Sequence, residues 1–330
     1  MVALEVRDQS QVAEARRLAT TTAAASGCGP TSSGRVAIVA TELATNLLKH
    51  GGGGELLLST YEAPGSCGVQ LLALDSGKGM PDVQACLRDG YSTAGSAGHG
   101  LGSVRRQSEL FDVFSLPGLG TAVLSRVSSS ETFQVQTSAT ARSGFINVPK
   151  PGEEVSGDAL SIAPIQIGLT MLVADGLGHG QEAAVASLEA VRLFQRHAGL
   201  SLTELLELMH AGMRATRGAA AAIVRFDPAQ PRVSFAGVGN VAGIVHTPGQ
   251  ARHMVSMNGT LGHNARKVQA FDYPCPAGSL VILHSDGLST SWSLDKYPGL
   301  RQRDPTLIAA VLYRDHARRR DDATVLVTKV

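Results

Sequence analysis

The sequence carries almost no net charge and contains no hydrophobic run long enough to cross a membrane. Lys and Arg number 29 and Asp and Glu 28, so the formal charge is +1, which gives no field to attract nucleic acid or an anionic membrane. A membrane helix needs about 20 apolar residues, and the best candidate, 162–173, is interrupted by Pro164 and Gln166. The start, MVALEVRDQS, lacks the basic flank and apolar segment of a signal peptide. We therefore expect no nucleic-acid partner and no membrane association.

Cysteine is scarce as well, and its placement excludes the common zinc motifs. The four cysteines, Cys28, Cys67, Cys86 and Cys275, are scattered without metal-ligand spacing. They are typical of reduced thiols and predict a cytoplasmic location. A length of 330 residues, 43% of them hydrophobic and 17% charged, predicts a globular protein of about two domains.

The most informative stretch is VADGLGHG at 173–180, where an apolar run ends at Asp175 and three glycines follow within five residues. A carboxylate at a strand end, on a backbone that an ion can approach, suits an oxygen-preferring divalent cation, although Asp-Gly is also a common turn. Repetition favours the metal. Acidic residues recur beside strand-like runs at SGD (156–158), HSDG (284–287) and RRDDAT (319–324). Together these carboxylates predict a two-metal site in the second half of the chain.

The first half contains three short motifs in an ordered series. ELATN lies on a predicted helix whose buried stripe includes Val36, Val39 and Leu43, and Glu42 and Asn46 share another face because they lie four residues apart. DSGKG follows a predicted strand and places Asp75 at the strand end. GHGLG precedes a helix, whose free N–H groups can hold phosphate. Each motif alone is as well explained by a packing turn or a solvated helix face, but the ordered set is more specific.

These three motifs resemble the nucleotide-binding boxes of the GHKL ATPase superfamily, over roughly residues 1–127. The short length and the ELATN form look most like its small serine kinases, the anti-sigma-factor and stressosome switch kinases. The resemblance implies that Asn46 ligates the Mg²⁺ on ATP, that Glu42 is the general base for the acceptor hydroxyl, and that Asp75 binds the adenine amino group. It also assigns five glycines to the ATP site: Gly77 and Gly79 beside the ring, and Gly98, Gly100 and Gly102 in the mobile lid.

The second half reads as a linker followed by strands and helices. The polar segment 128–132 is the predicted linker, and a strand is expected from Phe133 onward. Helices are expected at 181–198, with Val185, Leu188, Val191 and Phe194 inward, at 201–215 and at 304–317. Strands are expected at 219–226, 233–236, 241–246, 268–273, 280–284 and 323–330. This order predicts helices that cover a stacked pair of sheets.

The motifs PGEEVSGDA, VADGLGHG, HSDG and RDDATVLV look like those of the metal-dependent serine/threonine phosphatases of type 2C, in their compact bacterial form, over residues 133–330. The resemblance implies that Asp175, the Gly176 carbonyl, Asp286 and Asp321 hold two Mn²⁺ or Mg²⁺ ions, and that Asp158 holds a metal or a metal-bound water. Asp322 is the alternative to Asp321. Relatives carry an arginine where this chain has Glu153, so the phosphate-binding group is left open. His179 is either a general acid or a cap of the following helix.

The predicted fold class is therefore α+β: an N-terminal GHKL (Bergerat-type) α/β sandwich at 1–127, a linker at 128–132, and a PPM-type α/β sandwich of two sheets flanked by helices at 133–330. The predicted protein uses ATP and Mg²⁺ in its first domain and Mn²⁺ or Mg²⁺ in its second. By analogy with the families, it is a bifunctional regulator that phosphorylates, with ATP, and dephosphorylates a Ser or Thr of a STAS-type anti-sigma-factor antagonist or a stressosome protein. The alternative is a phosphatase whose N-terminal module only binds a partner, such as an anti-sigma factor, a sigma factor or another regulator.

Overall fold

The computed structural model describes residues 1–63, 66–87, 100–129, 141–265 and 267–330. By their contacts these residues form two compact units, 1–139 with 302–314 and 140–301 with 315–330. The predicted strand from Phe133 and most of the predicted linker 128–132 lie outside the described residues, as does Gly98. The predicted domain ranges therefore remain a prediction, and residues 302–314 group with the first unit although they come late in the sequence. No helix among the described residues is long and apolar enough to span a membrane.

Unit 1 is built on one antiparallel sheet of five strands in the order β1-β2-β3-β5-β4. Its strands are β1 (Val2–Val6), β2 (Gly54–Ala63), β3 (Ser66–Asp75), β4 (Leu110–Ser115) and β5 (Thr121–Ser128). Its helices are α1 (Gln9–Ala25), α2 (Pro30–Asn46), the π-helical segment Leu47–Gly51, α3 (Val83–Cys86), α4 (Gly100–Gln107) and α7 (Pro305–His316), of which residues to 314 belong to unit 1. Strand β1 is too short and mixed in polarity to be evident from the sequence.

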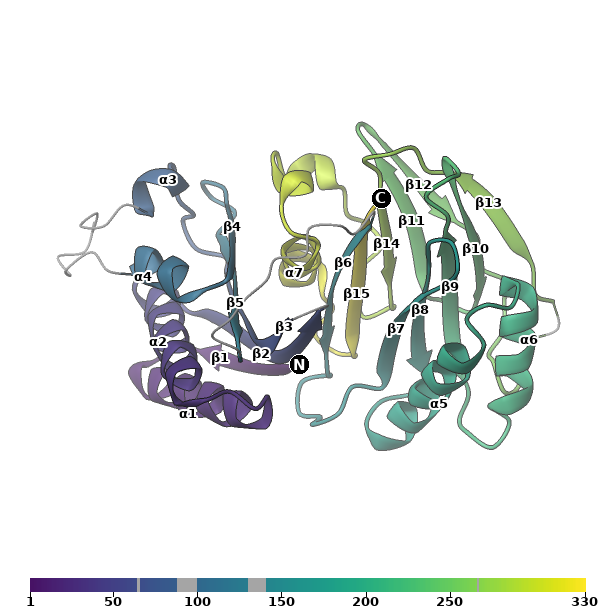
Figure 1. Ribbon diagram of the computed structural model, residues 1–330, viewed down its shortest axis with the longest axis horizontal. Coiled ribbons are helices and arrows are strands. Elements are labelled where there is room, and N and C mark those ends of the chain that lie inside the picture. The colour runs from purple at the N-terminus through teal and green to yellow at the C-terminus, as the bar shows by residue number, and fades with distance from the viewer. Residues whose placement is uncertain (64–65, 88–99, 130–140, 266) are drawn as a thin grey trace. The chain divides into compact units, whose positions relative to one another are not determined.

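Helices α1 and α2 cover one face of this sheet (Figure 1). Helix α1 begins at a capping box, in which Asp8 accepts from the Ser10 N–H and Gln11 accepts from the Asp8 N–H. Its inward side is a stripe of small residues, Ala15, Ala19 and Ala23, which permits close packing on α2. The predicted stripe of α2 is confirmed, because Val36, Val39, Ala40, Leu43 and Leu47 are all buried.

Helix α7 lies against the opposite face of the same sheet (Figure 1). Three polar contacts fix it there. Arg126 on β5 donates to Thr306 at 2.9 Å, Asp112 on β4 accepts from the Asp304 N–H at 2.7 Å, and Tyr313 donates to Glu55 on β2 at 2.9 Å. The alternation of strand residues places five large apolar side chains on this face, and all five are buried: Leu57, Leu72, Leu74, Phe114 and Leu124.

Unit 2 is a sandwich of two five-stranded sheets, β13-β10-β9-β8-β7 and β12-β11-β14-β15-β6. The first sheet consists of β7 (Asp158–Pro164), β8 (Leu169–Gly176), β9 (Ala219–Phe226), β10 (Arg232–Val238) and β13 (Ala270–Pro274). The second consists of β6 (Arg142–Val148), β11 (Ala242–Thr247), β12 (Gln250–Met254), β14 (Leu280–His284) and β15 (Ala323–Lys329). Two short 3₁₀ helices, Leu294–Lys296 and Leu300–Gln302, follow β14. The predicted fold class is confirmed in both parts.

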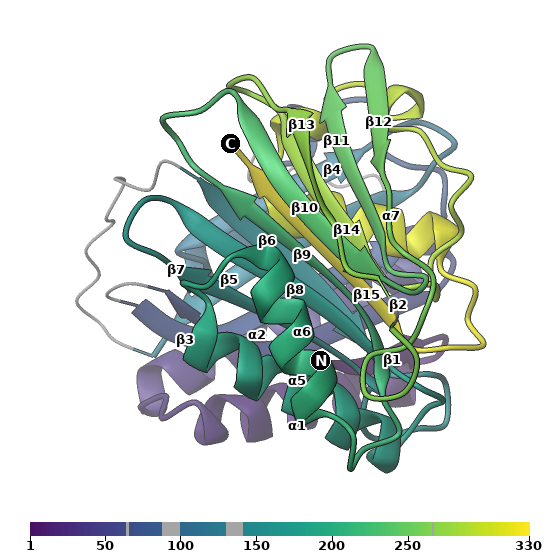
Figure 2. The ribbon, with the colours of Figure 1, turned by 90° about the vertical axis from the view of Figure 1, so that its right-hand side faces the viewer.

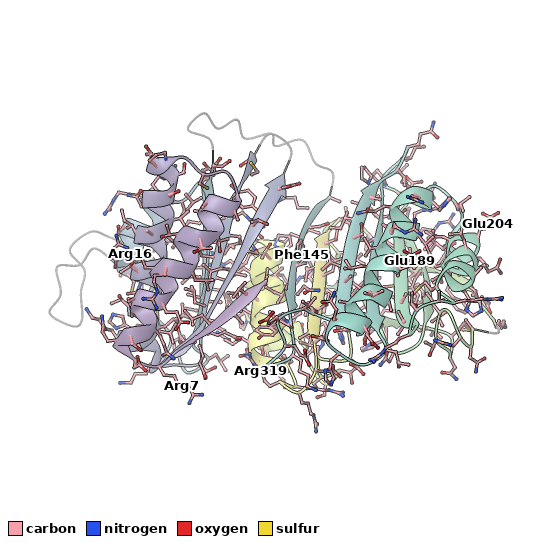
Figure 3. The ribbon with its side chains drawn as sticks, turned by 90° about the horizontal axis from the view of Figure 1, so that it is seen from below. Arg7, Arg16, Phe145, Glu189, Glu204 and Arg319 are labelled. Carbon is pink, nitrogen blue, oxygen red and sulfur yellow. The ribbon has the colours of Figure 1, made fainter. Side chains whose placement is uncertain are left out.

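Helices α5 (Gln181–His197) and α6 (Leu202–Gly212) cover the outer face of the first sheet (Figure 2). Phe194 and Leu206 pack there against Ile223 of β9, while Phe235 and Leu283 belong to the core between the two sheets. Burying one such side chain contributes about 1.5–3 kcal/mol. The outer side of the two helices carries Glu189 and Glu204 (Figure 3). The prediction that Val185 and Leu188 point inward is wrong: they are 51% and 58% exposed, because Ala183, Ala186 and Ala190 form the buried stripe.

The apolar run that ends at Asp175 is the second strand of a hairpin. Strands β7 and β8 are antiparallel and are joined by a turn that ends at Gly168. Gly168 has φ +89°, and a Cβ there would lie 1.9 Å from the Phe226 carbonyl oxygen, so the turn requires glycine. The hairpin places Asp158 directly opposite Asp175.

Candidate functional sites

The predicted ATP residues of unit 1 gather around the C-terminal end of α2. Asn46 is the last residue of the helix, and Glu42 is half-buried one turn earlier. A Cβ at Gly100 would lie 3.3 Å from Asn46 Oδ1, so α4 begins directly against this amide. Asn46 Nδ2 is buried without a hydrogen-bond partner in the described part of the chain. A buried polar atom with no partner is costly, so the geometry suits an amide that is completed by a bound ligand.

Asp75 ends β3 at the same end of α2, where it packs against Gly51. Its Oδ1 accepts from the Gly77 N–H at 2.9 Å and from the Thr121 N–H at 3.2 Å. Burial raises the pKa of Asp75, and these two hydrogen bonds, with Arg314 and His50, oppose that rise. The carboxylate is therefore oriented by the backbone before any ligand arrives.

Gly77 and Gly79 have a packing reason of their own. A Cβ at Gly77 would lie 2.8 Å from the Gly51 carbonyl oxygen, and Gly79, at φ +68°, would place one 2.0 Å from the Leu116 carbonyl oxygen. Their role beside an adenine ring remains a prediction. Gly102 is buried within α4, and Gly98 lies outside the described residues. Arg35 donates to the Gln107 carbonyl at 2.7 Å and so caps the far end of α4.

In unit 2 the predicted metal residues converge from both sheets. Asp158 and Asp175 are directly opposite each other on β7 and β8. Asp286 follows β14, and Asp321 and Asp322 precede the neighbouring β15. A Cβ at Gly157 would lie 2.8 Å from Asp322 Oδ2, which places the end of the first sheet beside the end of the second. We call these five aspartates the acidic cluster.

The electrostatics of the acidic cluster show how close its members are. Burial raises the pKa of Asp175 to about 9, and repulsion from the other four carboxylates contributes to the rise. Burial likewise raises the pKa of Asp158 to about 7, with Asp322 and Asp286 adding repulsion. The pKa of Asp286 is also raised, mainly by burial and then by Asp321, although Arg318 opposes the shift. Because these acidic groups oppose one another's ionisation, bound cations would favour their charged forms.

The donor atoms fit divalent cations. Asp158 Oδ2 and Asp322 Oδ2 are buried and have no hydrogen-bond partner within the described ranges, which leaves both free to ligate. No three His, Cys, Asp or Glu side chains in those ranges already surround a single point as a ligand set. The cluster is thus loose, as expected of carboxylates that repel each other, and its oxygens are the ligands that Mg²⁺ prefers.

Several neighbours that orient the cluster were not identified from the sequence. Asn240 donates to Asp286 Oδ2 at 2.7 Å. Ser285 and Thr324 hydrogen-bond the Asp158 side chain, and the Lys150 N–H donates to Asp322 Oδ1 at 2.8 Å. These contacts depend on the folded arrangement of the strands, so the sequence does not distinguish the four residues. His179 Nδ1 pairs with Glu153 Oε1 at 2.7 Å, while helix α5 begins at Gly180 without a side-chain cap, which disfavours the capping role for His179.

Comparison with known proteins matches two different families to the two parts of the sequence, and the second match includes residues 302–314, which the structure groups with unit 1. The family described as "Histidine kinase-like ATPase domain" matches residues 6–124, and "Stage II sporulation protein E (SpoIIE)" matches residues 167–330. The chain is 30% identical over 120 residues to "Serine/threonine-protein kinase RsbT" of Bacillus subtilis (strain 168), covering 36% of this chain and 90% of that protein. It is 28% identical over 157 residues to "Phosphoserine phosphatase RsbX" of the same organism, covering 47% of this chain and 79% of that protein.

One solved structure is similar to part of the chain. A chain described under "The bacterial stressosome: a modular system that has been adapted to control secondary messenger signaling" superposes with a TM-score of 0.54 and 28% identity. The match covers 57% of this chain and 99% of that chain.

Proposed function

Because the chain belongs to the histidine kinase-like ATPase family in its N-terminal part and to the SpoIIE family of phosphatases in its C-terminal part, we propose that it is a bifunctional regulator of serine or threonine phosphorylation. Unit 1 transfers phosphate from ATP to a partner protein, and unit 2 removes it. The partner is a STAS-type anti-sigma-factor antagonist or a stressosome protein in the cytoplasm. The similarity to RsbT and RsbX in separate halves of one chain supports this partner-switching role.

The acidic cluster is the observation that carries the phosphatase activity. Asp175, the Gly176 carbonyl, Asp286 and Asp321 would hold two Mn²⁺ or Mg²⁺ ions, with Asp322 as the alternative to Asp321, and Asp158 would hold a metal or a metal-bound water. Bound there, the ions would supply a hydroxide near neutral pH and neutralise the phosphate oxygens. Asn240 holds Asp286 in place, and Ser285 and Thr324 hold Asp158. His179, positioned by Glu153, is the candidate to protonate the leaving serine oxygen.

The phosphatase is tested with the full chain, Mn²⁺ and a phosphoserine peptide. Asp175→Asn and Asp286→Asn should each lower the turnover rate by about a thousandfold or more, since each removes a charged ligand. Asp272→Asn is the matched control, because Asp272 is an exposed aspartate of unit 2 on β13. Circular dichroism verifies that all variants are folded. Full activity in both cluster variants would disprove the metal assignment.

The kinase activity is tested with labelled ATP, Mg²⁺ and a STAS-domain protein. Label should appear on the partner and disappear with Glu42→Ala, while nucleotide binding persists, because a general base acts in transfer and not in binding. Glu14→Ala is the control, since Glu14 is exposed on α1. Nucleotide binding with no label from the unmodified chain would instead support a module that binds a partner without phosphorylating it.

A further inference from the structure

Glu153 places a negative charge where a phosphate-binding cation is expected in unit 2. Its carboxylate accompanies His179, and a Cβ at Gly180 would lie 2.9 Å from Glu153 Oε2. A negative group therefore lies at the start of α5, beside the loop 177–180 that follows Asp175. A phosphoryl group approaching the cluster needs a fixed cation outside the metal ions, and Glu153 cannot provide one.

Arg217 provides a cation near the same loop. A Cβ at Gly178 would lie 3.3 Å from Arg217 Nη1, so the guanidinium rests on the backbone two residues after Gly176. Gly178 has φ +93°, and the absence of a side chain there leaves the guanidinium uncovered toward the loop. A planar guanidinium with several donors is the side chain best suited to phosphate.

The backbone around Arg217 is rigidly held. The Leu177 N–H donates to the Gly218 carbonyl at 3.0 Å. This bond joins the residue after Arg217 to the loop 177–180, which follows Asp175. On the other side, Thr216 Oγ1 accepts from the Gly218 N–H at 3.0 Å and donates to the Met213 carbonyl at 2.7 Å. These hydrogen bonds fix the turn that contains Arg217 to the loop that follows Asp175.

The ion partner of Arg217 is weakly held. Its guanidinium pairs with Glu182 in the first turn of α5, and the two side chains are 49% and 69% exposed. An ion pair this exposed contributes little stability. A dianionic phosphate can therefore displace Glu182 at small cost.

From these contacts we propose that Arg217, beside the loop 177–180 that follows Asp175, binds the substrate phosphoryl group. It would take the role of the arginine that relatives carry at the position of Glu153. The inference rests on the proposed phosphatase function of unit 2. It assigns Arg217 to substrate binding and product release, and it leaves metal binding to the aspartates.

The test compares Arg217→Ala and Arg217→Lys with Arg192→Ala in the full, Mn²⁺-loaded chain. Arg192 is the matched control, because it pairs with Glu189 on α5 and is 47% exposed. It follows Glu182 by ten residues, which is about 15 Å along a helix. Arg217→Ala should raise KM for a phosphoserine peptide and the inhibition constant of inorganic phosphate about 10- to 100-fold. Arg217→Lys should lie between, since lysine keeps the charge and loses the fork. Arg192→Ala should match the unmodified chain.

Two readouts separate phosphate binding from a structural role. The Mn²⁺ concentration for half-maximal activity should be the same in Arg217→Ala and the unmodified chain. Glu182→Gln should leave phosphate inhibition unchanged or strengthen it about two- to threefold, because it releases the arginine. A rise in the inhibition constant with Glu182→Gln, a shift in the Mn²⁺ requirement, or equal constants for Arg217→Ala and Arg192→Ala would each overturn the inference.

Failure of the proposed function gives a different result. If the unmodified chain shows no Mn²⁺-dependent hydrolysis, the phosphatase proposal fails, and calorimetric titration of the Mn²⁺-loaded chain with inorganic phosphate still tests the arginine. Weaker phosphate binding in Arg217→Ala than in Arg192→Ala then supports the inference, and equal binding refutes it.

Discussion

At the scale of single residues, the acidic cluster couples stability to pH and to metal. Asp158 and Asp175 have folded pKa values of about 7 and about 9, both above the ordinary value near 3.8. The folded chain therefore binds protons more tightly than the unfolded chain, and the resulting stability is present at low pH and is lost as pH rises through 7 and then 9. Divalent cations should oppose this loss, because they replace the protons.

We accordingly expect the free energy of unfolding in chelator to fall by up to about 5 kcal/mol between pH 6 and 9, most of it from Asp175, and to fall less with Mn²⁺. Urea denaturation at each pH, with and without Mn²⁺, measures the difference. Asp175→Asn serves as a control that should flatten the profile in chelator, since it removes the group with the highest pKa. Parallel profiles with and without metal would contradict the idea that protons and cations compete for these carboxylates.

The same residues show what the sequence could and could not reveal. The four acidic motifs predicted the convergence of Asp158, Asp175 and Asp286, because each carboxylate follows or precedes a recognisable strand. Asn240 could not be predicted, since its hydrogen bond to Asp286 depends on the pairing of strands 40 residues apart. The contact of Arg217 with Gly178 could not be predicted for the same reason, because nothing in the sequence around Arg217 indicates it.

At the scale of elements, helix α7 covers the second face of the sheet of unit 1. Without it, Leu57, Leu72, Leu74, Phe114 and Leu124 would lose their cover on one face. A fragment of residues 1–139 should therefore bind the dye ANS and aggregate, because so large an exposed apolar patch is rare in soluble proteins. Joining residues 302–316 to the fragment by a flexible linker should reduce both effects. Dye fluorescence and size-exclusion chromatography measure them, and a monomeric fragment 1–139 that does not bind ANS would contradict the role of α7.

Elements differ in how far the sequence predicted them. Helix α2 was predicted from its period of 3.6 residues, which its buried stripe confirms. Helix α7 was predicted as a helix, but its segment PTLIAAVLY has apolar residues on all sides and no stripe that indicates which sheet it covers. Strand β12, QARHM, was missed because it is a largely exposed edge strand without alternation.

At the scale of the whole molecule, the two proposed activities, kinase and phosphatase, would only hydrolyse ATP if both ran together. We expect a nucleotide or a partner to control one of them. The order of the chain offers a route: α7 lies in sequence between Asp286 and Asp321, and Arg314 within it donates to the Asp75 carbonyl at 3.1 Å, beside the predicted adenine position. A ligand that moves Asp75 therefore acts on a helix whose flanking segments carry metal residues.

A non-hydrolysable ATP analogue, or the STAS partner for the reverse reaction, should change the rate of peptide dephosphorylation several-fold. The change should be smaller in Arg314→Ala, which lacks the hydrogen bond to Asp75, than in the control Arg16→Ala on the outer side of α1 (Figure 3). Initial rates with and without each ligand provide the measurement. Identical rates in every case would exclude control of this kind.

The late position of α7 also bears on how the protein is made. When residues 1–139 have emerged from the ribosome, β1 to β5 of the unit 1 sheet have been made, but helix α7, which covers the second face of that sheet, has not. That helix emerges some 160 residues later, after most of the other unit. The nascent chain must therefore keep an apolar surface out of solution for much of its synthesis, which makes this face the expected binding site for a chaperone during translation.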